Sequence, residues 1–440
     1  FGSSCLGPSS LREPPGPVGS MIAYRKGCCG LPVILHCAGT TWPSGILPAL
    51  LSACIGLIFD RIAHLDKVIS DEEVFLDNPY PFQLFAFLVG FVMVFRTNFA
   101  YQRWWEALDA VQRMGAKWFD GACMTIAFDA PGDVNSPFLV GGRAPQKPSE
   151  PNQTGREHAE FMQEILHLFS LLHALALQHL RCDPDLRNLQ VQKILAITDE
   201  LPSSVKGLAQ PTPEISVPTC GLGAHGLVAF SEARIKGKHQ LQKLKILGSL
   251  RPEELVLLDA CTRHSQAPTL ARVAMVQGWI MRRLLCRQKH ESRGDMGKTS
   301  PPILSRLCHV IADGHLGFNQ ASKVVIVPFP FEYHNIIRLF LWIYAFTVPF
   351  VVNSNVFTTP ARFTLTFLVV WAYFALCKVG DNLEDPFLPY DDNELPLQSI
   401  QQGFNARLLT LRTIPAKPVR SVMGTKESAA VVEGHAADGG

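Results

Sequence analysis

The segment at residues 85–105, FAFLVGFVMVFRTNFAYQRWW, combines a regular row of aromatic side chains with a sudden change to polar ones. Phe87, Phe91 and Phe95 recur every four residues, and since each helical residue turns by about 100°, they form one stripe. Several copies of this helix around a shared axis would stack three rings of phenyl groups. Such a hydrophobic neck controls ion passage by wetting and dewetting, and partially positive phenyl edges tolerate anions better than cations.

Polar side chains continue the stripe beyond its last phenylalanine. Asn98 and Gln102 lie along the same track, where burial against lipid would be costly. Arg96 and Arg103 stand seven residues apart, about two turns, and so lie on one side of the helix. We expect Arg96, Asn98 and Arg103 to attract anions at the wider end of the neck. The alternative is a stripe that only packs against a neighbouring helix, which would give these polar residues no role.

The composition predicts the membrane environment that a pore requires. Charged residues make up only 18% of the 440-residue chain and hydrophobic ones 47%, whereas soluble domains are about a quarter charged. A helix crosses a bilayer with roughly 20 mostly apolar residues, and four stretches suit that length. These predicted spans are 43–62, 81–102, 333–353 and 362–380. The fold class that follows is an all-α, multi-pass membrane protein with four transmembrane helices and a helical cytosolic domain.

Two of the predicted spans open with prolines, in NPYPF at 78–82 and VPFPFEYH at 327–334. Proline suits the first helical turn, where its missing N–H leaves no carbonyl unpaired. The free N–H groups of a helix start, with the positive end of its dipole, form an anion site. The partners we expect are therefore small anions and the lipid bilayer. The net charge of only +2 gives no reason to expect nucleic acid.

Patterns typical of enzymes are weak in this chain. The GKTS run at 297–300 lacks the earlier glycine of a phosphate-binding loop, because position 292 is Ser292. His167, His173 and His179 are six residues apart, a rotation of about 600°, which points them to different helix faces. We therefore expect no enzymatic activity, no metal held by these histidines, and no cofactor unless it is calcium.

Calcium is a candidate because residues 381–394, DNLEDPFLPYDDNE, hold six carboxylates just past the last predicted span. Carboxylate oxygens are the ligands that calcium prefers, and Asp391, Asp392 and Glu394 are the candidate ligands. The segment does not match the EF-hand loop. The alternative is a solvated acidic turn that pairs with basic helices.

At these motifs the sequence resembles the bestrophin family of anion channels, in its bacterial, plant and algal branch. The motifs are VFRTNFAYQRWWEA at 94–107, VPFPFEYHNIIRLFLWIYAFTVPF at 327–350 and LEDPFLPYDDNELPL at 383–397. The resemblance implies a homopentamer with four membrane helices per subunit and one central pore. It further implies passive transport of chloride, with bicarbonate or nitrate as other permeant anions.

The resemblance also implies roles for single residues. The family's neck falls on the three phenylalanines of the stripe, and its second, cytosolic constriction falls on Val327, with Ile326 as the alternative. Animal members bind calcium through consecutive acids after an Asn-Pro-Phe-Gly turn, whereas residues 384–388 here read EDPFL. The missing glycine and the broken acidic run weaken the calcium prediction.

The chain divides into six predicted regions. They are an N-terminal tail (1–42) with the composition of a targeting segment, membrane helices 1 and 2 with a cytosolic extension (43–128), a disordered insertion (129–157), a helical cytosolic region with linkers (158–318), membrane helices 3 and 4 with the acidic segment (319–410), and a disordered tail (411–440). Within the cytosolic region, helices are predicted at 160–180, 251–262 and 273–288, and residues 203–247 and 288–301 as linkers.

Three functions stay open from the sequence. An anion channel explains the stripe and its polar continuation, whereas a non-conducting membrane scaffold explains only the aromatic part. An anion-coupled transporter would favour an inverted repeat or broken helices at the membrane midplane, and neither is visible. For the membrane itself, a chloroplast thylakoid and a plasma membrane are both compatible with an algal-type relative.

Overall fold

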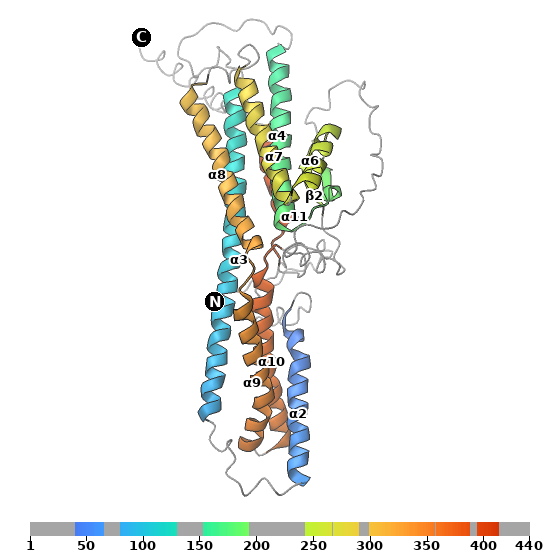
Figure 1. Ribbon diagram of the computed structural model, residues 1–440, viewed down its shortest axis with the longest axis vertical. Coiled ribbons are helices and arrows are strands. Elements are labelled where there is room, and N and C mark those ends of the chain that lie inside the picture. The colour runs from blue at the N-terminus through green and yellow to red at the C-terminus, as the bar shows by residue number, and fades with distance from the viewer. Residues whose placement is uncertain are drawn as a thin grey trace, which may run out of the picture.

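The computed structural model describes residues 40–65, 80–129, 153–192, 243–265, 267–289, 299–356, 358–387 and 394–412. Nearly all of them lie in helices, arranged as two halves stacked along one long axis (Figure 1). The lower half in that view is a bundle of apolar helices. The upper half, called the head below, contains the shorter helices and the only strands among the described residues.

The membrane half is built from long helices with few charges. A short 3-10 turn, η1 (Trp42–Gly45), leads into α2 (Ile46–Leu65), which packs with α9 (Phe331–Asn355) and α10 (Thr359–Glu384). The first part of α3 (Tyr80–Asp129) packs against the same two helices, α9 and α10. Each of these four helices is long and apolar enough to cross a membrane. The predicted fold class is confirmed, and all four predicted spans lie within these helices.

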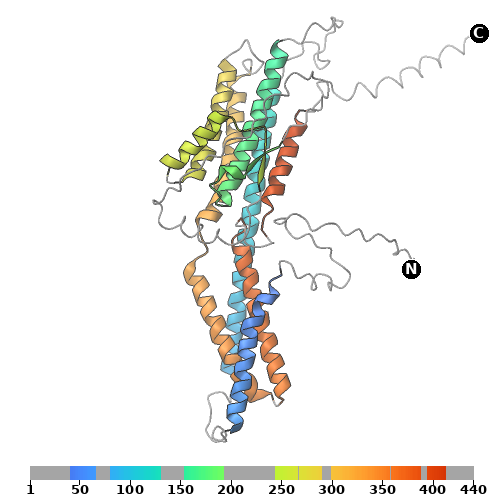
Figure 2. The same cartoon turned by 90° about the vertical axis from the view of Figure 1, so that its right-hand side faces the viewer.

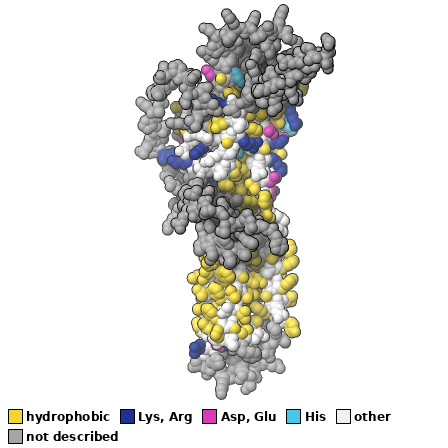
Figure 3. Space-filling model, turned by 180° about the vertical axis from the view of Figure 1, so that it is seen from behind, with side chains coloured by type: hydrophobic (Ala, Val, Ile, Leu, Met, Phe, Trp, Pro, Cys, Tyr) yellow, Lys and Arg dark blue, Asp and Glu magenta, His cyan; other side chains and the backbone are white. Residues whose placement is uncertain are grey.

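Apolar side chains of the membrane half point both inward and outward. Val89, Met93, Leu341 and Val370 are buried in its core. Many large apolar side chains on the same helices are exposed, and Figure 3 shows hydrophobic side chains covering this half while Lys and Arg gather mainly on the head. Such an outer surface is stable only against lipid or another protein.

α3 joins the two halves, because it continues as a helix well past the predicted membrane span. At 50 residues and 1.5 Å per residue it is about 75 Å long, and it runs from one half into the other in both ribbon views (Figures 1 and 2). In the head it packs against α8 (Pro301–Ile326). Gly314 and Gly317 permit this close approach: a Cβ on Gly314 would lie 2.2 Å from the Trp118 ring.

The head surrounds α4 (Gln153–Leu180), which is buried along most of its length. α4 contacts α3, α8, α7 (Pro268–Lys289) and α11 (Leu397–Thr410), and α6 (Pro252–His264) packs on α7. The predicted cytosolic helices are therefore present. α4 begins seven residues earlier than predicted, α6 ends two residues later, and α7 is longer at both ends.

Two of the predicted loop segments overlap regular structure. Residues 203–247 include a strand, β2 (Leu244–Leu247), which pairs in parallel with β1 (Leu189–Gln192), just after the 3-10 turn η3 (Leu186–Asn188). The 129–157 insertion overlaps helix at both ends, since α3 ends at Asp129 and α4 begins at Gln153. The predictions for the N-terminal tail, for the middle of the insertion and for the C-terminal tail fall almost wholly outside the described residues.

Candidate pore-lining site

Four phenylalanines form a continuous column along the membrane part of α3. The ring centroids of Phe87 and Phe91 lie 6.1 Å apart, those of Phe91 and Phe95 4.6 Å, and those of Phe95 and Phe99 6.2 Å. Phe87, Phe91 and Phe95 are 71%, 52% and 41% exposed. The structure thus brings the three predicted neck residues together and adds Phe99 as a fourth member.

The opposite face of α3 holds it against its own bundle. Val89, Met93, Arg96 and Ala100 are buried at helical spacing and point away from the aromatic column. The column is exposed along Phe87, Phe91 and Phe95, whereas at Phe99 the Tyr333 ring of α9 lies against it, with ring centroids 6.4 Å apart. Its surface is therefore available to water, to lipid or to a second copy of the chain.

The polar continuation of the stripe is also exposed. Asn98 and Gln102 both lie on the outward side of α3. Amide side chains at this level of a membrane helix favour contact with water over contact with lipid. Their position agrees with the column facing an aqueous space.

Arg96, predicted to attract anions, is instead buried inside the chain and is 2% exposed. One of its guanidinium nitrogens lies 2.5 Å from Asp381 Oδ1 and 3.2 Å from Glu384 Oε2. Its other terminal nitrogen donates to the Cys377 carbonyl at 3.1 Å. The two carboxylates neutralise this arginine inside the chain, and this arrangement favours a structural role over the predicted attraction of anions.

Three side chains of the same cluster are spaced like the ligands of a metal ion. His334, Asp381 and Glu384 have ligand atoms within 4.8 Å of one another, close enough to hold an ion. The Arg96 nitrogen already occupies the position between them, since it also lies 3.0 Å from His334 Nδ1. Arg338 pairs with Asp381 as well, so two arginines balance the two carboxylates. An added cation would have to displace a guanidinium.

Arg103 has a different set of partners. It donates to the Glu384 carbonyl at 2.9 Å, to the Val327 carbonyl at 2.7 Å and to the Val324 carbonyl. These carbonyls stand at the ends of α8 and α10, where the helix dipole is negative. No carboxylate among the described residues forms an ion pair with Arg103, so the prediction that it attracts anions stays open.

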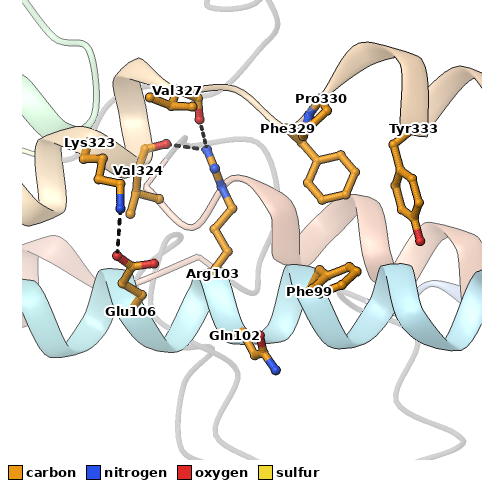
Figure 4. A pocket seen from close by; sticks show the side chains of 10 residues that line it. All are labelled: Phe99, Gln102, Arg103, Glu106, Lys323, Val324, Val327, Phe329, Pro330 and Tyr333. Carbon is orange, nitrogen blue, oxygen red and sulfur yellow. Dashed lines mark hydrogen bonds and ion pairs between the residues drawn. The ribbon is translucent and has the colours of Figure 1, made fainter.

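A groove of about 600 Å³ opens beside Arg103 between α3 and the α8–α9 junction. Figure 4 shows aromatic rings of Phe99, Phe329 and Tyr333 toward one end and the Lys323–Glu106 ion pair toward the other. Val327, predicted as the second constriction, lies on the groove wall and its side chain is 53% exposed.

The calcium prediction falls mostly outside the described residues. Asp391 and Asp392 are not among them, and Glu394 is half-buried at the start of the next described segment. The prediction therefore remains untested for all three residues.

The histidines of α4 are separate structural residues, as their spacing predicted. His167 donates to the Leu247 carbonyl at 2.6 Å, and His173 donates to the Gln401 side chain at 2.6 Å. His179 forms hydrogen bonds with hydroxyl groups of α7 and α8. Burial lowers the pKa of His173, and likewise that of His179, to about 4, so both are neutral at physiological pH.

Sequence reasoning missed the partners of Arg96. Asp381 and Glu384 are three residues apart at the end of α10, which places both carboxylates on one helix face. That spacing was visible, but the pairing joins residues 285 positions apart. Phe99 was missed although it continues the four-residue spacing of the stripe.

The fold and this site define a class of protein: a multi-pass helical membrane protein whose second spanning helix extends into a helical head and turns an aromatic column outward. The family model of the bacterial and fungal bestrophins matches residues 33–120 and 225–410, more than half of the chain. The chain therefore belongs to the bestrophin family, whose members are anion channels and not enzymes.

Solved structures agree on the fold. A mutant of a bacterial bestrophin homologue from Klebsiella pneumoniae matches with a TM-score of 0.53 at 13% identity, over 85% of this chain and 99% of that one. Another structure of a bestrophin homologue from the same organism gives 0.52 at 13% identity, over 84% and 97%. No curated protein matches the chain. At such low identity the structural likeness shows the fold alone.

Proposed function

We propose that this chain is a passive anion channel, with chloride as the default permeant ion and bicarbonate or nitrate as further ones. Five copies surround one axis and turn their α3 helices toward it. Phe87, Phe91 and Phe95 then form three rings that narrow the pore, and Val327 forms a second constriction. Membership of an anion-channel family supports the transport class.

The observation that carries the proposal is the exposed aromatic column on α3. Its rings contact one another in series, while the opposite face of the helix is buried. A row of phenyl groups alone would suit lipid, but the exposed Asn98 and Gln102 on the same side favour an aqueous surface. A central pore explains both the aromatic and the polar part of this helix face, since a hydrophobic neck can open into a water-filled vestibule.

Positive potential near the neck comes from few groups. Arg103 keeps its charge because carbonyl oxygens bind it and no described carboxylate pairs with it. Asn98 supplies an amide donor on the exposed face. The start of α9 has no side-chain cap and lies beside the groove, but the carboxylate of Glu332 in its first turn offsets the positive end of the helix dipole.

The test is anion current through the purified protein in a planar bilayer. Replacing Phe87, Phe91 and Phe95 together by alanine is expected to raise the current several-fold, because water then enters the neck more readily. The matched control replaces three exposed apolar residues of α10 by alanine: Leu365, Leu368 and Leu376. Equal currents for well-folded wild type, neck variant and control would show that the three phenylalanines do not narrow the conduction path.

A non-conducting scaffold would use the same column to pack against another protein. Two measurements distinguish such a scaffold from a channel: the mass of the protein in detergent and its conductance in a bilayer. The channel requires an assembly of about five chains of 48.6 kDa each and a reversal potential that follows the chloride gradient. Replacing chloride with nitrate or bicarbonate on one side of the bilayer then ranks the permeant anions by the shift in reversal potential. An anion-coupled transporter would instead require a second, co-transported ion for any current.

A further inference from the structure

Two of the four residues at the junction between α8 and α9 are prolines, so two of the backbone N–H groups that could close the helix end are missing. The sequence of the junction is Val327-Pro328-Phe329-Pro330, and proline has no N–H. In a continuing helix, the carbonyl of residue 324 would accept from the N–H of residue 328, which is Pro328. The Val324 carbonyl is therefore left without its helical donor, and the guanidinium of Arg103 supplies one.

Arg103 also binds the next part of the junction. It donates to the Val327 carbonyl at 2.7 Å, while the Val327 N–H donates to the Lys323 carbonyl at 3.0 Å. The backbone of Val327 is thus held on both sides. Its side chain remains exposed, as a constricting residue requires.

The third partner of Arg103 lies on another helix. The Glu384 carbonyl stands at the last residue of α10, within the acidic segment 381–394, and accepts from the Arg103 Nε at 2.9 Å. One planar guanidinium on the neck helix therefore joins the ends of α8 and α10. Lysine could not replace it, because a single ammonium on a flexible stem cannot span carbonyls from two helices in a fixed geometry.

We infer that Arg103 is the positioning residue that ties the second constriction at Val327 to the phenylalanine neck, so that the two narrow points move together. This inference rests on the proposed function. It goes beyond it because it makes the two constrictions one mechanical unit, with the end of α10 as the third connected part. A displacement of the acidic segment would then reach both constrictions through this side chain.

The first test measures coupling between Arg103 and Val327 by chloride conductance. Val327→Ala is expected to raise conductance in the wild-type background, and to have little further effect in Arg103→Gln, whose constriction is already displaced. The control is Arg113→Gln on the same helix, whose exposed side chain pairs with Asp109 and bonds Gln320 of α8 but none of the junction carbonyls. Additive effects of Arg103→Gln and Val327→Ala would overturn the inference.

The second test does not depend on conduction. Hydrogen exchange in the peptide at 323–334 is expected to be roughly 10- to 100-fold faster in Arg103→Gln, the factor that corresponds to losing hydrogen bonds from a charged donor. Arg113→Gln should leave this peptide unchanged. Unchanged exchange in Arg103→Gln would overturn the inference. Faster exchange in a protein that carries no current would keep Arg103 as the residue that positions the α8–α9 junction and would reject the proposed channel.

A rescue variant separates positioning from general loss of stability. Pro328→Ala restores an N–H at the position that the Val324 carbonyl lacks. We expect the double variant Arg103→Gln/Pro328→Ala to regain much of the protection from hydrogen exchange. Adding Val327→Ala to this double variant should again raise the conductance. Arg103→Lys should recover less than this double variant. No recovery from Pro328→Ala would contradict the donor-replacement argument.

Discussion

Replacing Arg96 by glutamine is expected to destabilise the chain strongly. The guanidinium is almost fully buried and bonds Asp381, Glu384 and His334 with one nitrogen. Glutamine leaves Arg338 as the remaining described cation paired with this cluster, so one half-buried carboxylate charge stays uncompensated. Removing one member of a buried ion pair costs about 3–5 kcal/mol.

An exposed pair on the same helix provides the matched control. Arg113 and Asp109 are both exposed and form an i,i+4 pair at 2.8 Å. Exposed pairs of this kind contribute roughly 0–1 kcal/mol, so Arg113→Gln should change stability little. Thermal unfolding of both variants in the same detergent compares the two costs directly, with Tm as the measured quantity.

A second substitution tests the charge argument itself. Glu384→Gln removes the carboxylate that Arg96→Gln leaves unpaired, so the double variant should have a higher Tm than Arg96→Gln alone. A double variant as unstable as the sum of the two single changes would refute the reasoning, because the cost would then come from lost packing. An equal Tm for Arg96→Gln and Arg113→Gln would refute it more simply.

Two further predictions concern the head. Gly314→Ala should lower Tm clearly, because its Cβ would lie 2.2 Å from the Trp118 ring, whereas Gly278→Ala, with open space around it, should not. Stability should also fall as pH drops from about 6.5 toward 4. His173 is buried neutral with its pKa lowered to about 4, so the unfolded chain binds a proton first. In His173→Gln, Tm should change less with pH between about 6.5 and 4 than it does in the wild type.

The four spans could be predicted from the sequence because crossing a bilayer is a local property. Length and low charge are enough to place them, and the spans found lie around those predicted. The strands could not be predicted in the same way. β1 and β2 have four residues each, and their parallel pairing joins Leu189 to Leu244 across a long intervening segment. Short strands of that kind depend on the tertiary structure that brings them together.

The aromatic column illustrates what spacing can and cannot settle. The four-residue repeat correctly placed Phe87, Phe91 and Phe95 on one helix face. It could not decide whether the chain's own helices cover that face. This depends on which side of α3 carries the better core residues, and Val89, Met93 and Ala100 on the other side pack inward.

Arg96 and Arg103 show why helical position alone does not assign a charge its role. Both were placed on one side of α3, two turns apart, and both do reach the end of α10. Arg96 meets carboxylates there, which cancel its charge, while Arg103 meets carbonyl oxygens, which bind the guanidinium but carry only partial charges. If the proposed neck draws anions electrostatically, Arg103 is therefore the better source of positive potential, since Glu332 offsets the dipole at the start of α9. Arg96 then acts by holding the neck helix in place.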